Sequence, residues 1–573
     1  MKKQQQYSKR LMLHKLNLAK FISILLFICL SIGCKNSHTV KEKEIVKVPE
    51  KMDDQISDNI RAVLNFAKES NGAINDSTKL SVFSVVNSFY EKNGYQGIWS
   101  HEEKWKTVAD SMFQFIKNSR YYGLYPDDYH YKQINLLRLK IQNDSLARMD
   151  AVAWTKADLL LTDAFMKTLK DLKEGRILPD SLSIVLKDNF IDSFFISKLN
   201  TSLSANDVSE TFKSVEPTNL NYVSLKQLLP DFVDKMDTQK YLFVHFPYID
   251  TLVFYKELQQ RLLQSGFGSS EIEAPDSALL SKEIKKYQAK HKLTADGKAG
   301  ENTIRSLNLN DNEKFRRIAL TLDRYKMLSP LPESYIWVNL PGLYLKVFDH
   351  DSVVVESKVI IGKPTTPTPV LQSQITNMVT YPNWTIPESI IRKDILPALK
   401  VNPGYLASKG FSLVDYNGET VDPFTVKWSK YKKGIPWKIV QGSGDDNALG
   451  IFKFNFNNPY SVYLHDTNQR YLFANSNRAL SHGCVRVQNW EALAFYIARN
   501  DSIATKPGHP LSYNADSIRT WIANKSRKTI MVKKRLPLYI QYFTCEEKND
   551  KIVFYNDVYG EDNVLEEKYF ANK

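Results

Sequence analysis

The side chains best suited to covalent chemistry lie between residues 463 and 487, in the stretch YLHDTNQRYLFANSNRALSHGCVRV. The whole chain has four cysteines, and Cys484 stands here with His482 two positions before it and His465 farther upstream. A thiol attacks as its thiolate, and a neighbouring imidazole can take the proton. Backbone N–H groups beside Gly483 could stabilise an oxyanion. The stretch therefore predicts an acyl-transfer site with Cys484 as nucleophile and a histidine as base.

Three other interpretations of these residues stay open at this point. Arg486 could hold a substrate carboxylate or pair with an acidic side chain of the protein. His465, His482 and Cys484 are all possible zinc ligands, although the usual zinc-site spacings are missing. Cys484 could instead form a disulfide with Cys545, because an exported chain can oxidise its thiols.

The N-terminus predicts export. Lysines and an arginine precede the short apolar run FISILLFICLSIG, which stops at Cys34. The run is short for a membrane span and suits the core of a signal peptide. The ending LSIGC resembles a bacterial lipobox, so we expect residues 1–33 to be a lipoprotein signal peptide and Cys34 to carry lipid. An uncleaved anchor and an ordinary signal peptide are the alternatives. Residues 34–60 are charged and predict a tether.

Length and charge limit the classes of protein that need to be considered. A chain of 573 residues exceeds one hydrophobic core and predicts about two to four domains. With 43% hydrophobic and 24% charged residues it is globular in composition. The net charge of +14 fits either a solvated surface or an anionic partner, such as a membrane or a wall polymer. No basic recognition helix or zinc-finger spacing supports a nucleic-acid partner.

Two regions with helical periodicity precede the reactive stretch. From 61 to 250, apolar residues recur at helical spacing and predict a mostly helical scaffold domain; examples are Val82, Val85, Val86 and Phe89, and then Trp154, Leu161, Phe165, Leu169 and Leu172. A smaller unit spans 251–311 and contains KYQAKHKLTADGKAGENTIRSLN. This pattern resembles the three-helix peptidoglycan-binding domain. A helical packing module without a ligand is the alternative.

The remaining residues, 312–573, change to the period of strands. The run YIWVNLPGLYLKVFDHDSVVVESKVIIGKP alternates apolar and polar residues around two turns. Residues 388–440 interrupt the strands with helix and loop patterns, which predicts an inserted subdomain. The end of the chain, PLYIQYFTCEEKNDKIVFYNDVYG, predicts a hairpin that returns to the sheet. The class expected is multidomain α+β.

The pair YLHDT and SHGCVRV closely resembles the signature of the L,D-transpeptidases, cysteine enzymes that cross-link peptidoglycan. The segments YYGLYPDDYH and NWTIPESI extend the likeness to the large, multidomain branch of that family. The resemblance implies a helical scaffold, a peptidoglycan-binding domain and a β-rich catalytic domain with a capping insertion. It makes His465 the general base and Cys484 the nucleophile. The other residues that it places around the site are Ser481, His482, Gly483 and Arg486.

The resemblance also implies an activity. Cys484 would attack the carbonyl of the third stem residue of a tetrapeptide, release D-alanine and form a 3–3 cross-link with a second stem, without a metal or cofactor. Its partners would be peptidoglycan stem peptides and glycan, its place the periplasmic side of the envelope, and carbapenems would be inhibitors. The alternatives are L,D-carboxypeptidase action, attachment of proteins to the wall, exchange of D-amino acids, and an inactive wall-binding scaffold.

Overall fold

The fold is known from a computed structural model of the chain. The residues that it describes are 41–177, 192–268, 277–291, 293–328, 330–504 and 512–570. The predicted signal peptide, Cys34 and the first part of the tether lie outside these residues. The chain forms two compact units; the first holds most of the residues before 212, and the second holds the rest together with two short earlier segments.

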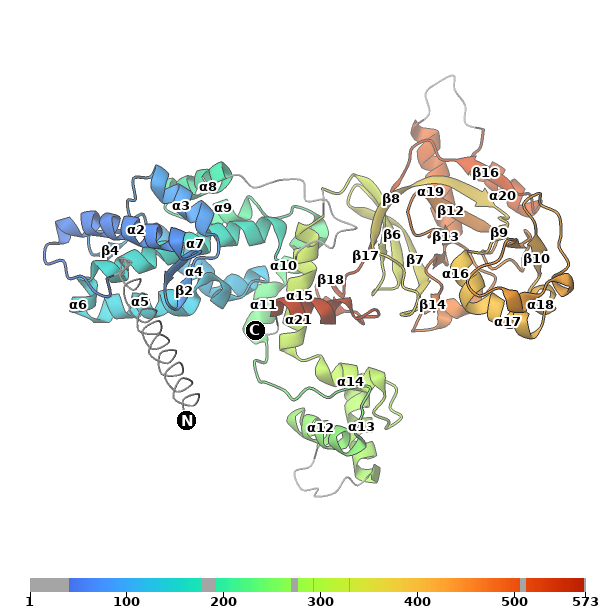
Figure 1. Ribbon diagram of the computed structural model, residues 1–573, viewed down its shortest axis with the longest axis horizontal. Helices are drawn as coiled ribbons and strands as arrows, with labels where there is room; N and C mark the ends of the chain where they lie inside the picture. Colours follow the sequence, from blue (N-terminus) through green and yellow to red (C-terminus); the bar gives the residue numbers. More distant parts are fainter. Residues whose placement is uncertain are drawn as a thin grey trace, which may run out of the picture. The chain divides into compact units, whose positions relative to one another are not determined.

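The first unit is helical, with short two-stranded ribbons. Its long helices are α2 (Met52–Glu69), α3 (Phe83–Lys92), α4 (Thr107–Lys117), α5 (Tyr131–Asn143), α7 (Ala151–Glu174) and α8 (Asp192–Ala205), and its ribbons are β1 (Ala73–Asn75) with β2 (Thr78–Lys79) and β3 (Ser100–His101) with β4 (Lys104–Trp105) (Figure 1). Helix α7 continues into the second unit. Trp154, Leu161 and Phe165 on α7 are fully buried. The helical scaffold predicted from apolar spacing is confirmed.

In the second unit, a small helical domain follows the short helices α10 (Leu220–Gln227) and α11 (Leu229–Lys235). Its helices are α12 (Thr251–Gln264), α13 (Ser277–Lys290) and α14 (Glu301–Asn308). They enclose an apolar core of their own, which includes Phe254, Leu258, Leu262, Ile284, Tyr287, Ile304 and Leu307. Helix α15 (Asp311–Lys326) follows, and its first turn is capped by Asn310, whose side chain accepts the Glu313 N–H.

The sequence signature of that helical domain has a structural cause. The buried Gln288 side chain accepts the Gly297 N–H at 2.8 Å and donates to Asp296 at 2.9 Å and Thr303 at 3.0 Å. Gly297 has φ +76°, and a Cβ there would lie 2.3 Å from the Ser281 hydroxyl. The motif therefore fixes one tight turn between two helices, because a buried amide must satisfy its donors and acceptor.

The catalytic region is built on a large sheet whose strands follow the order β12-β13-β15-β7-β6-β5-β17-β8-β16. An additional pairing of β12 with β8 closes the sheet on itself, and β14 pairs with β7. The strands are β5 (Ser334–Asn339), β6 (Tyr344–Asp349), β7 (Ser352–Gly362), β8 (Leu371–Thr380), β12 (Phe452–Phe456), β13 (Leu464–His465), β14 (Ala479–Ser481), β15 (Val485–Val487), β16 (Lys528–Met531) and β17 (Pro537–Gln541). Helices α19 (Trp490–Ala504) and α20 (Ala515–Ala523) pack on its core.

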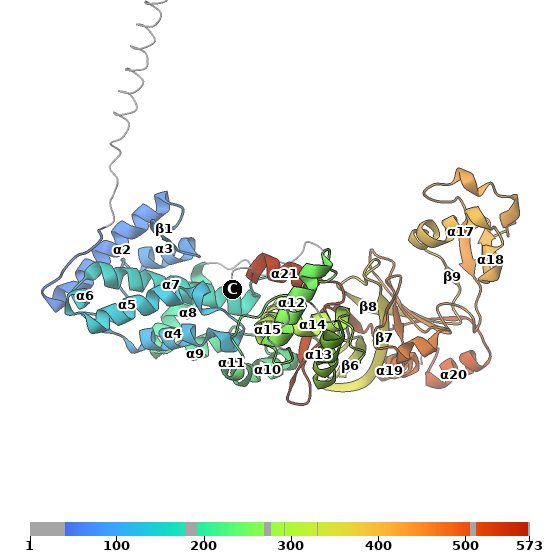
Figure 2. The same cartoon turned by 90° about the horizontal axis from the view of Figure 1, so that it is seen from below.

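The predicted insertion forms a subdomain with its own small sheet and core. Strands β9 (Trp384–Thr385), β10 (Phe411–Val414) and β11 (Lys438–Gln441) pair in the order β10-β11-β9. The sheet thus begins slightly before the expected boundary at 388. Its helices α16 (Glu388–Ile390), α17 (Leu396–Val401) and α18 (Tyr405–Ser408) surround a separate apolar core. Figure 2 shows α17, α18 and β9 gathered in one group. We call residues 384–441 the cap.

The C-terminal segment differs from the hairpin expected from its sequence. Strand β17 enters the large sheet between β5 and β8, parallel to β5. The true hairpin is the next pair, β18 (Cys545–Glu547) and β19 (Ile552–Phe554), which forms a separate sheet before α21 (Glu561–Phe570). Alternation of apolar residues does not reveal which partner a strand will take. Within the described residues, no helix is long and apolar enough to cross a membrane.

Candidate active site

Strand β13 fixes His465 between two neighbours. It pairs antiparallel with β12, where Lys453 lies opposite His465, and parallel with β15, where Arg486 lies opposite it. His465 is 4% exposed. Residues directly opposite on neighbouring strands project to the same face of a sheet, so the imidazole lies between two cationic side chains. The two cations and the histidine come from three different segments of the sequence.

The turn between β14 and β15 holds Cys484. The Ser481 hydroxyl donates to the Cys484 carbonyl at 2.6 Å and accepts the Gly483 N–H at 3.1 Å. The Thr368 hydroxyl donates to the Gly483 carbonyl at 2.8 Å. Gly483 has φ +119°, a conformation that side chains with a Cβ rarely adopt. The role of Ser481 and Gly483 is therefore to shape and fix the turn that presents the thiol.

The pKa of the Cys484 thiol is raised, whereas the pKa of the His465 imidazole is lowered. Burial raises the pKa of Cys484, while hydrogen bonds from Tyr463 and the charges of Lys453 and Arg486 oppose that rise. Burial, and then the charges of Arg486 and Lys453, lower the pKa of His465 to about 3. At neutral pH both the thiol and the imidazole are therefore neutral, because the pKa of the thiol lies above neutral pH and that of the imidazole lies below it. A neutral imidazole is the form that can accept a proton.

Cys484 and His465 line the same cavity of about 300 Å³. Ser481, His482 and Arg486 contribute to its wall, so the structure brings together the residues predicted from the sequence. The cap supplies another part of the wall, with Trp384, Pro387, Glu388, Ser389 and Ile390. The cavity therefore combines a candidate nucleophile, a candidate base and a wall from the cap, a subdomain that has its own apolar core. Within the described ranges, no group of three side chains that could hold a metal ion is present.

His482 has a different surrounding from His465. Its Nε2 lies 2.9 Å from the Asp394 carboxylate, which belongs to the π-helical turn Ile391–Ile395 of the cap. His482 is also about two-fifths exposed. The contact joins the cysteine turn to the cap, and it gives His482 a partner other than the thiol. This geometry favours His465 over His482 as the base.

Cys545 lies apart from this chemistry. Both Cys545 and Cys484 are free thiols, so the disulfide considered from the sequence is not formed. Cys545 is fully buried, and its Sγ lies 3.2 Å from the Thr321 hydroxyl on α15. Burial raises the pKa of this thiol to about 12. Cys545 therefore remains protonated and inaccessible, and it acts as a small core side chain.

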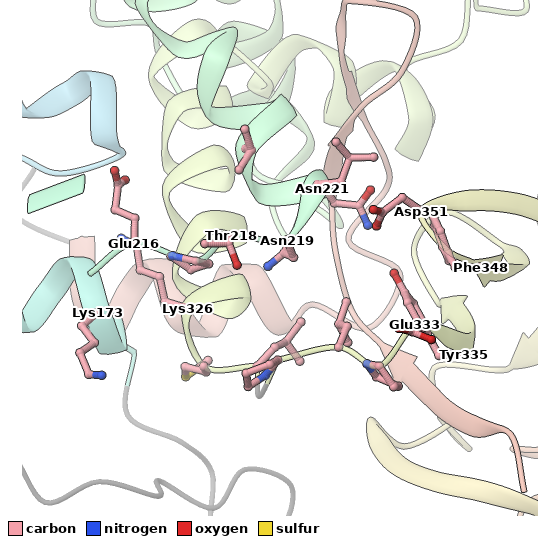
Figure 3. A pocket seen from close by; sticks show the side chains of 18 of the residues that line it. Lys173, Glu216, Thr218, Asn219, Asn221, Lys326, Glu333, Tyr335, Phe348 and Asp351 are labelled. Carbon is pink, nitrogen blue, oxygen red and sulfur yellow. The ribbon is translucent and has the colours of Figure 1, made fainter. Parts of the chain in front are cut away.

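A larger cavity of about 930 Å³ lies elsewhere in the second unit. Figure 3 shows Glu216 and Lys173 toward one side of it and Asn221, Asp351 and Tyr335 toward the other. No cysteine is among its lining residues. Size alone does not identify a catalytic site, and the smaller cavity is the one that holds a thiol beside an imidazole.

Sequence reasoning missed several residues of the site. Lys453, Tyr463 and Trp384 lie close to the thiol, and Asp394 reaches the cysteine turn from the cap. Tyr463 precedes His465 by two positions, so strand alternation could have placed both on one face. Lys453 depends on the register between β12 and β13, which no local pattern reveals.

Known families match three parts of the chain. Residues 84–229 match a family described as a scaffold domain, and residues 254–307 match a "Putative peptidoglycan binding domain". Residues 333–501 match the L,D-transpeptidase catalytic domain, and this range contains both Cys484 and His465.

Among curated proteins, the chain is similar to a Haemophilus influenzae protein named "Putative L,D-transpeptidase". The two are 33% identical over 277 residues, which is 47% of this chain and 54% of the relative. The chain thus matches about half the length of that relative.

Two solved structures show weaker similarity. One is the catalytic domain from E. faecium L,D-transpeptidase acylated by ertapenem, 13% identical, covering 37% of this chain and 100% of that chain with a TM-score of 0.17. The other is an L,D-transpeptidase from Mycobacterium smegmatis, 13% identical, covering 36% of this chain and 58% of that chain with a TM-score of 0.18. Scores this low support no conclusion about this chain.

Proposed function

The chain carries an L,D-transpeptidase catalytic domain and a peptidoglycan-binding domain, and from this premise we propose that it forms 3–3 cross-links between peptidoglycan stems. The observation that carries the proposal is that Cys484, His465 and the first residues of the cap line one cavity. A half-buried thiol that shares a cavity with a neutral imidazole is equipped for acyl transfer, since the imidazole can move the proton at each step.

In the first half-reaction, Cys484 attacks the carbonyl carbon between the third residue of a tetrapeptide stem and its terminal D-alanine. The thiol proton passes to His465 as the C–S bond forms. The Gly483 N–H is already bonded to Ser481, so the Cys484 N–H is the first donor available to the oxyanion. The C–N bond then breaks, His465 returns the proton to the leaving amine, and D-alanine departs.

In the second half-reaction, the side-chain amine of another stem attacks the thioester. His465 takes a proton from that amine as the new C–N bond forms. The C–S bond breaks, and the proton returns to the sulfur of Cys484. Atoms and charge balance over the cycle without a further reactant. With water in place of the amine, the same steps give hydrolysis and a tripeptide.

We also propose that the protein works in the cell envelope with peptidoglycan stem peptides and glycan as its partners. The match of residues 254–307 to a peptidoglycan-binding domain supports this partner, and the net charge of +14 suits an anionic surface. A lipid on Cys34 would hold the chain at a membrane through the charged tether. Carbapenems would acylate Cys484, because a strained carbonyl beside an oxyanion donor invites attack by the thiolate.

Product analysis tests the proposed activity. The mature full-length protein is incubated with a defined disaccharide-tetrapeptide, and the products are separated and identified by mass spectrometry. We expect D-alanine and a 3–3-linked dimer from the wild type and from Cys545→Ala, and neither from Cys484→Ala. Tripeptide without dimer would replace cross-linking by carboxypeptidase action, and loss of turnover in Cys545→Ala alone would overturn the assignment of the nucleophile.

A further inference from the structure

We infer that Lys453, acting together with Tyr463, is a positioning residue that favours the thiolate form of Cys484 as it forms. This inference deepens the proposed function, on which it rests for its catalytic meaning. Lys453 lies outside the YLHDT and SHGCVRV elements from which the site was predicted, whereas Tyr463 is the first residue of YLHDT and was given no role there.

The alternation of β12 sends Lys453 to the face that carries the site. Phe452, Phe454 and Phe456 are buried in the core of the large sheet, so Lys453 between them projects to the opposite face. Its cross-strand partner is His465. Strand alternation also places Tyr463 on the face of His465, and their rings meet edge to face with centroids 5.5 Å apart.

The ammonium of Lys453 lies against the face of Tyr463. The distance from Nζ to the centroid of the Tyr463 ring is 3.8 Å, which is close for a cation–π contact. Tyr463 adjoins Cys484, because both line the same cavity and the Tyr463 carbonyl accepts the N–H of the next residue, Val485, at 3.2 Å. Hydrogen bonding from Tyr463 also opposes the rise that burial causes in the pKa of Cys484. Lys453 therefore fixes the ring that contacts the thiol, and it adds a positive charge behind that ring.

The charge of Lys453 has no carboxylate counterpart in the described part of the chain, since none of the ion pairs there involves it. Burial lowers the pKa of this half-buried lysine, and the charge of Cys484 opposes that effect. A half-buried cation without an anion is costly unless an anion forms beside it. The thiolate of Cys484 is the anion that this position can offset.

Other charged groups face the same sulfur. Arg486 is the second cation, and its Nη1 donates to the Gln469 amide oxygen at 3.1 Å. His465 cannot supply a positive charge before the reaction starts, because its pKa is lowered to about 3. His482 is paired with Asp394, and Glu388 of the cap lines the cavity. Lys453 and Arg486 are thus the fixed positive charges available to a developing thiolate.

Alkylation of Cys484 in the free protein measures how readily its thiolate forms at each pH, and the measurement needs no substrate. The rate of modification by iodoacetamide is followed across about pH 7 to 12, because the pKa of Cys484 is raised, with intact-protein mass spectrometry to count adducts. We expect Lys453→Met to move the midpoint upward by about one pH unit or more, because an opposite charge nearby shifts a titration by that order. Lys453→Arg should keep the wild-type midpoint, since it keeps the charge.

Lys346→Met is the matched control. Lys346 lies 4.6 Å from the ring centroid of Tyr344 on β6, so this variant removes a similar cation–π contact that does not involve the thiol. Its midpoint should stay at the wild-type value. An unchanged midpoint in Lys453→Met, or an equal shift in Lys346→Met, would overturn the inference.

Two further measurements distinguish an error in the role given to Lys453 from misfolding of the variant and from an error in the proposed cross-linking activity. Thermal unfolding shows whether Lys453→Met folds. If it does not, Tyr463→Phe is the second test, because it keeps the ring that contacts Lys453 and removes the hydroxyl group near the sulfur. We expect this variant to raise the midpoint of alkylation by a smaller amount. An unchanged midpoint in Tyr463→Phe would then overturn the inference. Wild-type protein that shows the expected alkylation shifts but makes no dimer would refute the proposed function while leaving the role of Lys453 intact.

Discussion

At the scale of single residues, the site works with its two key groups neutral at rest. Burial pushes the pKa of Cys484 up and that of His465 down to about 3. A stable thiolate–imidazolium pair would require the opposite order, with the imidazole the stronger base. In the proposed reaction, proton transfer would therefore be coupled to attack on the carbonyl.

A prediction about pH follows from these two shifts. The reactive form has an unprotonated His465 and a protonated Cys484, so it dominates above the lowered pKa of His465 and below the raised pKa of Cys484. We expect kcat/KM for D-alanine release to be flat from about pH 5 to pH 8. The measurement is a pH profile at low donor concentration in buffers of constant ionic strength. A bell-shaped profile with an acid limb near pH 6 would indicate a charged imidazole instead.

The sequence predicted Cys484 and His465, because their residue types and spacing carry a family signature. It also predicted Ser481 and Gly483 near the thiol, since they adjoin it in the chain. Lys453 remained unpredicted because its neighbourhood depends on the pairing of two strands. Local patterns identify which side chains can react, whereas the register decides which charges surround them.

At the scale of elements, a glycine in the turn before β12 forms a tight junction with the residues that follow His465 at the end of β13. Gly450 has φ +62°, and a Cβ there would lie 2.3 Å from the Asp466 carboxylate and 2.6 Å from the Thr467 amide. Asp466 is buried next to His465, accepts the Ile451 N–H at 3.1 Å and pairs with Arg470 at 2.6 Å. The glycine lets the backbone approach this carboxylate.

Gly450→Ala should therefore destabilise the protein and disturb the base. We expect a loss of about 2–4 kcal/mol in the free energy of unfolding, from strain at a positive φ together with the broken contacts of Asp466. Denaturant unfolding measures this loss. Gly444→Ala is the matched control, because a Cβ there would meet nothing within 4 Å. Equal stability of the two variants would show that this junction tolerates a side chain.

The cap is expected from the sequence to cover the site, and the structure supplies a way to test this role. Its three-stranded sheet has a separate core, and its first residues line the cavity of Cys484. An acyl-thioester open to water would be hydrolysed, so a transferase must exclude water and orient the amine. We therefore expect the cap to govern which acceptor reaches the thioester.

Shortening the cap should favour hydrolysis. Thr385 on β9 pairs with Val440 on β11, so a short linker can replace residues 388–437 without separating the ends. We expect Cys484 to keep its reactivity toward small electrophiles while the ratio of dimer to tripeptide falls by about tenfold. Product analysis gives this ratio. A folded, shortened variant with wild-type partitioning would show that the cap does not control access of water.

The elements also show where sequence patterns stop being informative. Helical spacing located α7, and strand alternation located the β-rich region and the interruption within it. From the same alternation, the C-terminal segment was predicted to be one hairpin. In the structure, β17 lies inside the large sheet, and β18 and β19 form the hairpin. Parallel pairing of β17 with β5 joins residues about two hundred positions apart in sequence, and no local signal encodes such a contact.

At the scale of the whole molecule, the proposed function combines wall binding, catalysis and attachment to a membrane. The peptidoglycan-binding and catalytic matches are separate in sequence, at 254–307 and 333–501. The proposed attachment would depend on Cys34, which lies outside the described residues. A charged tether before the folded body would let an anchored enzyme reach stems at a distance from the membrane.

Cys34→Ser should move the protein from the membrane to the soluble fraction of its native host, or stall its processing. The reason is that only the cysteine at the lipobox position can accept lipid, whereas Cys29 would leave with the signal peptide. Cell fractionation and metabolic labelling with a fatty acid follow the outcome. Cys29→Ser is the control and should stay attached. Normal cleavage with unchanged attachment in Cys34→Ser would refute lipidation at this position.

The central claim is that Cys484 carries the acyl group, and intact-protein mass spectrometry tests it most directly. The mature protein is mixed with a disaccharide-tetrapeptide donor in the absence of an acceptor and quenched in acid at short times. The account predicts an adduct equal to the donor minus D-alanine, located by digestion on the peptide that contains Cys484, present in Cys545→Ala and absent in Cys484→Ala. An adduct on another residue, or turnover by Cys484→Ala, would contradict it.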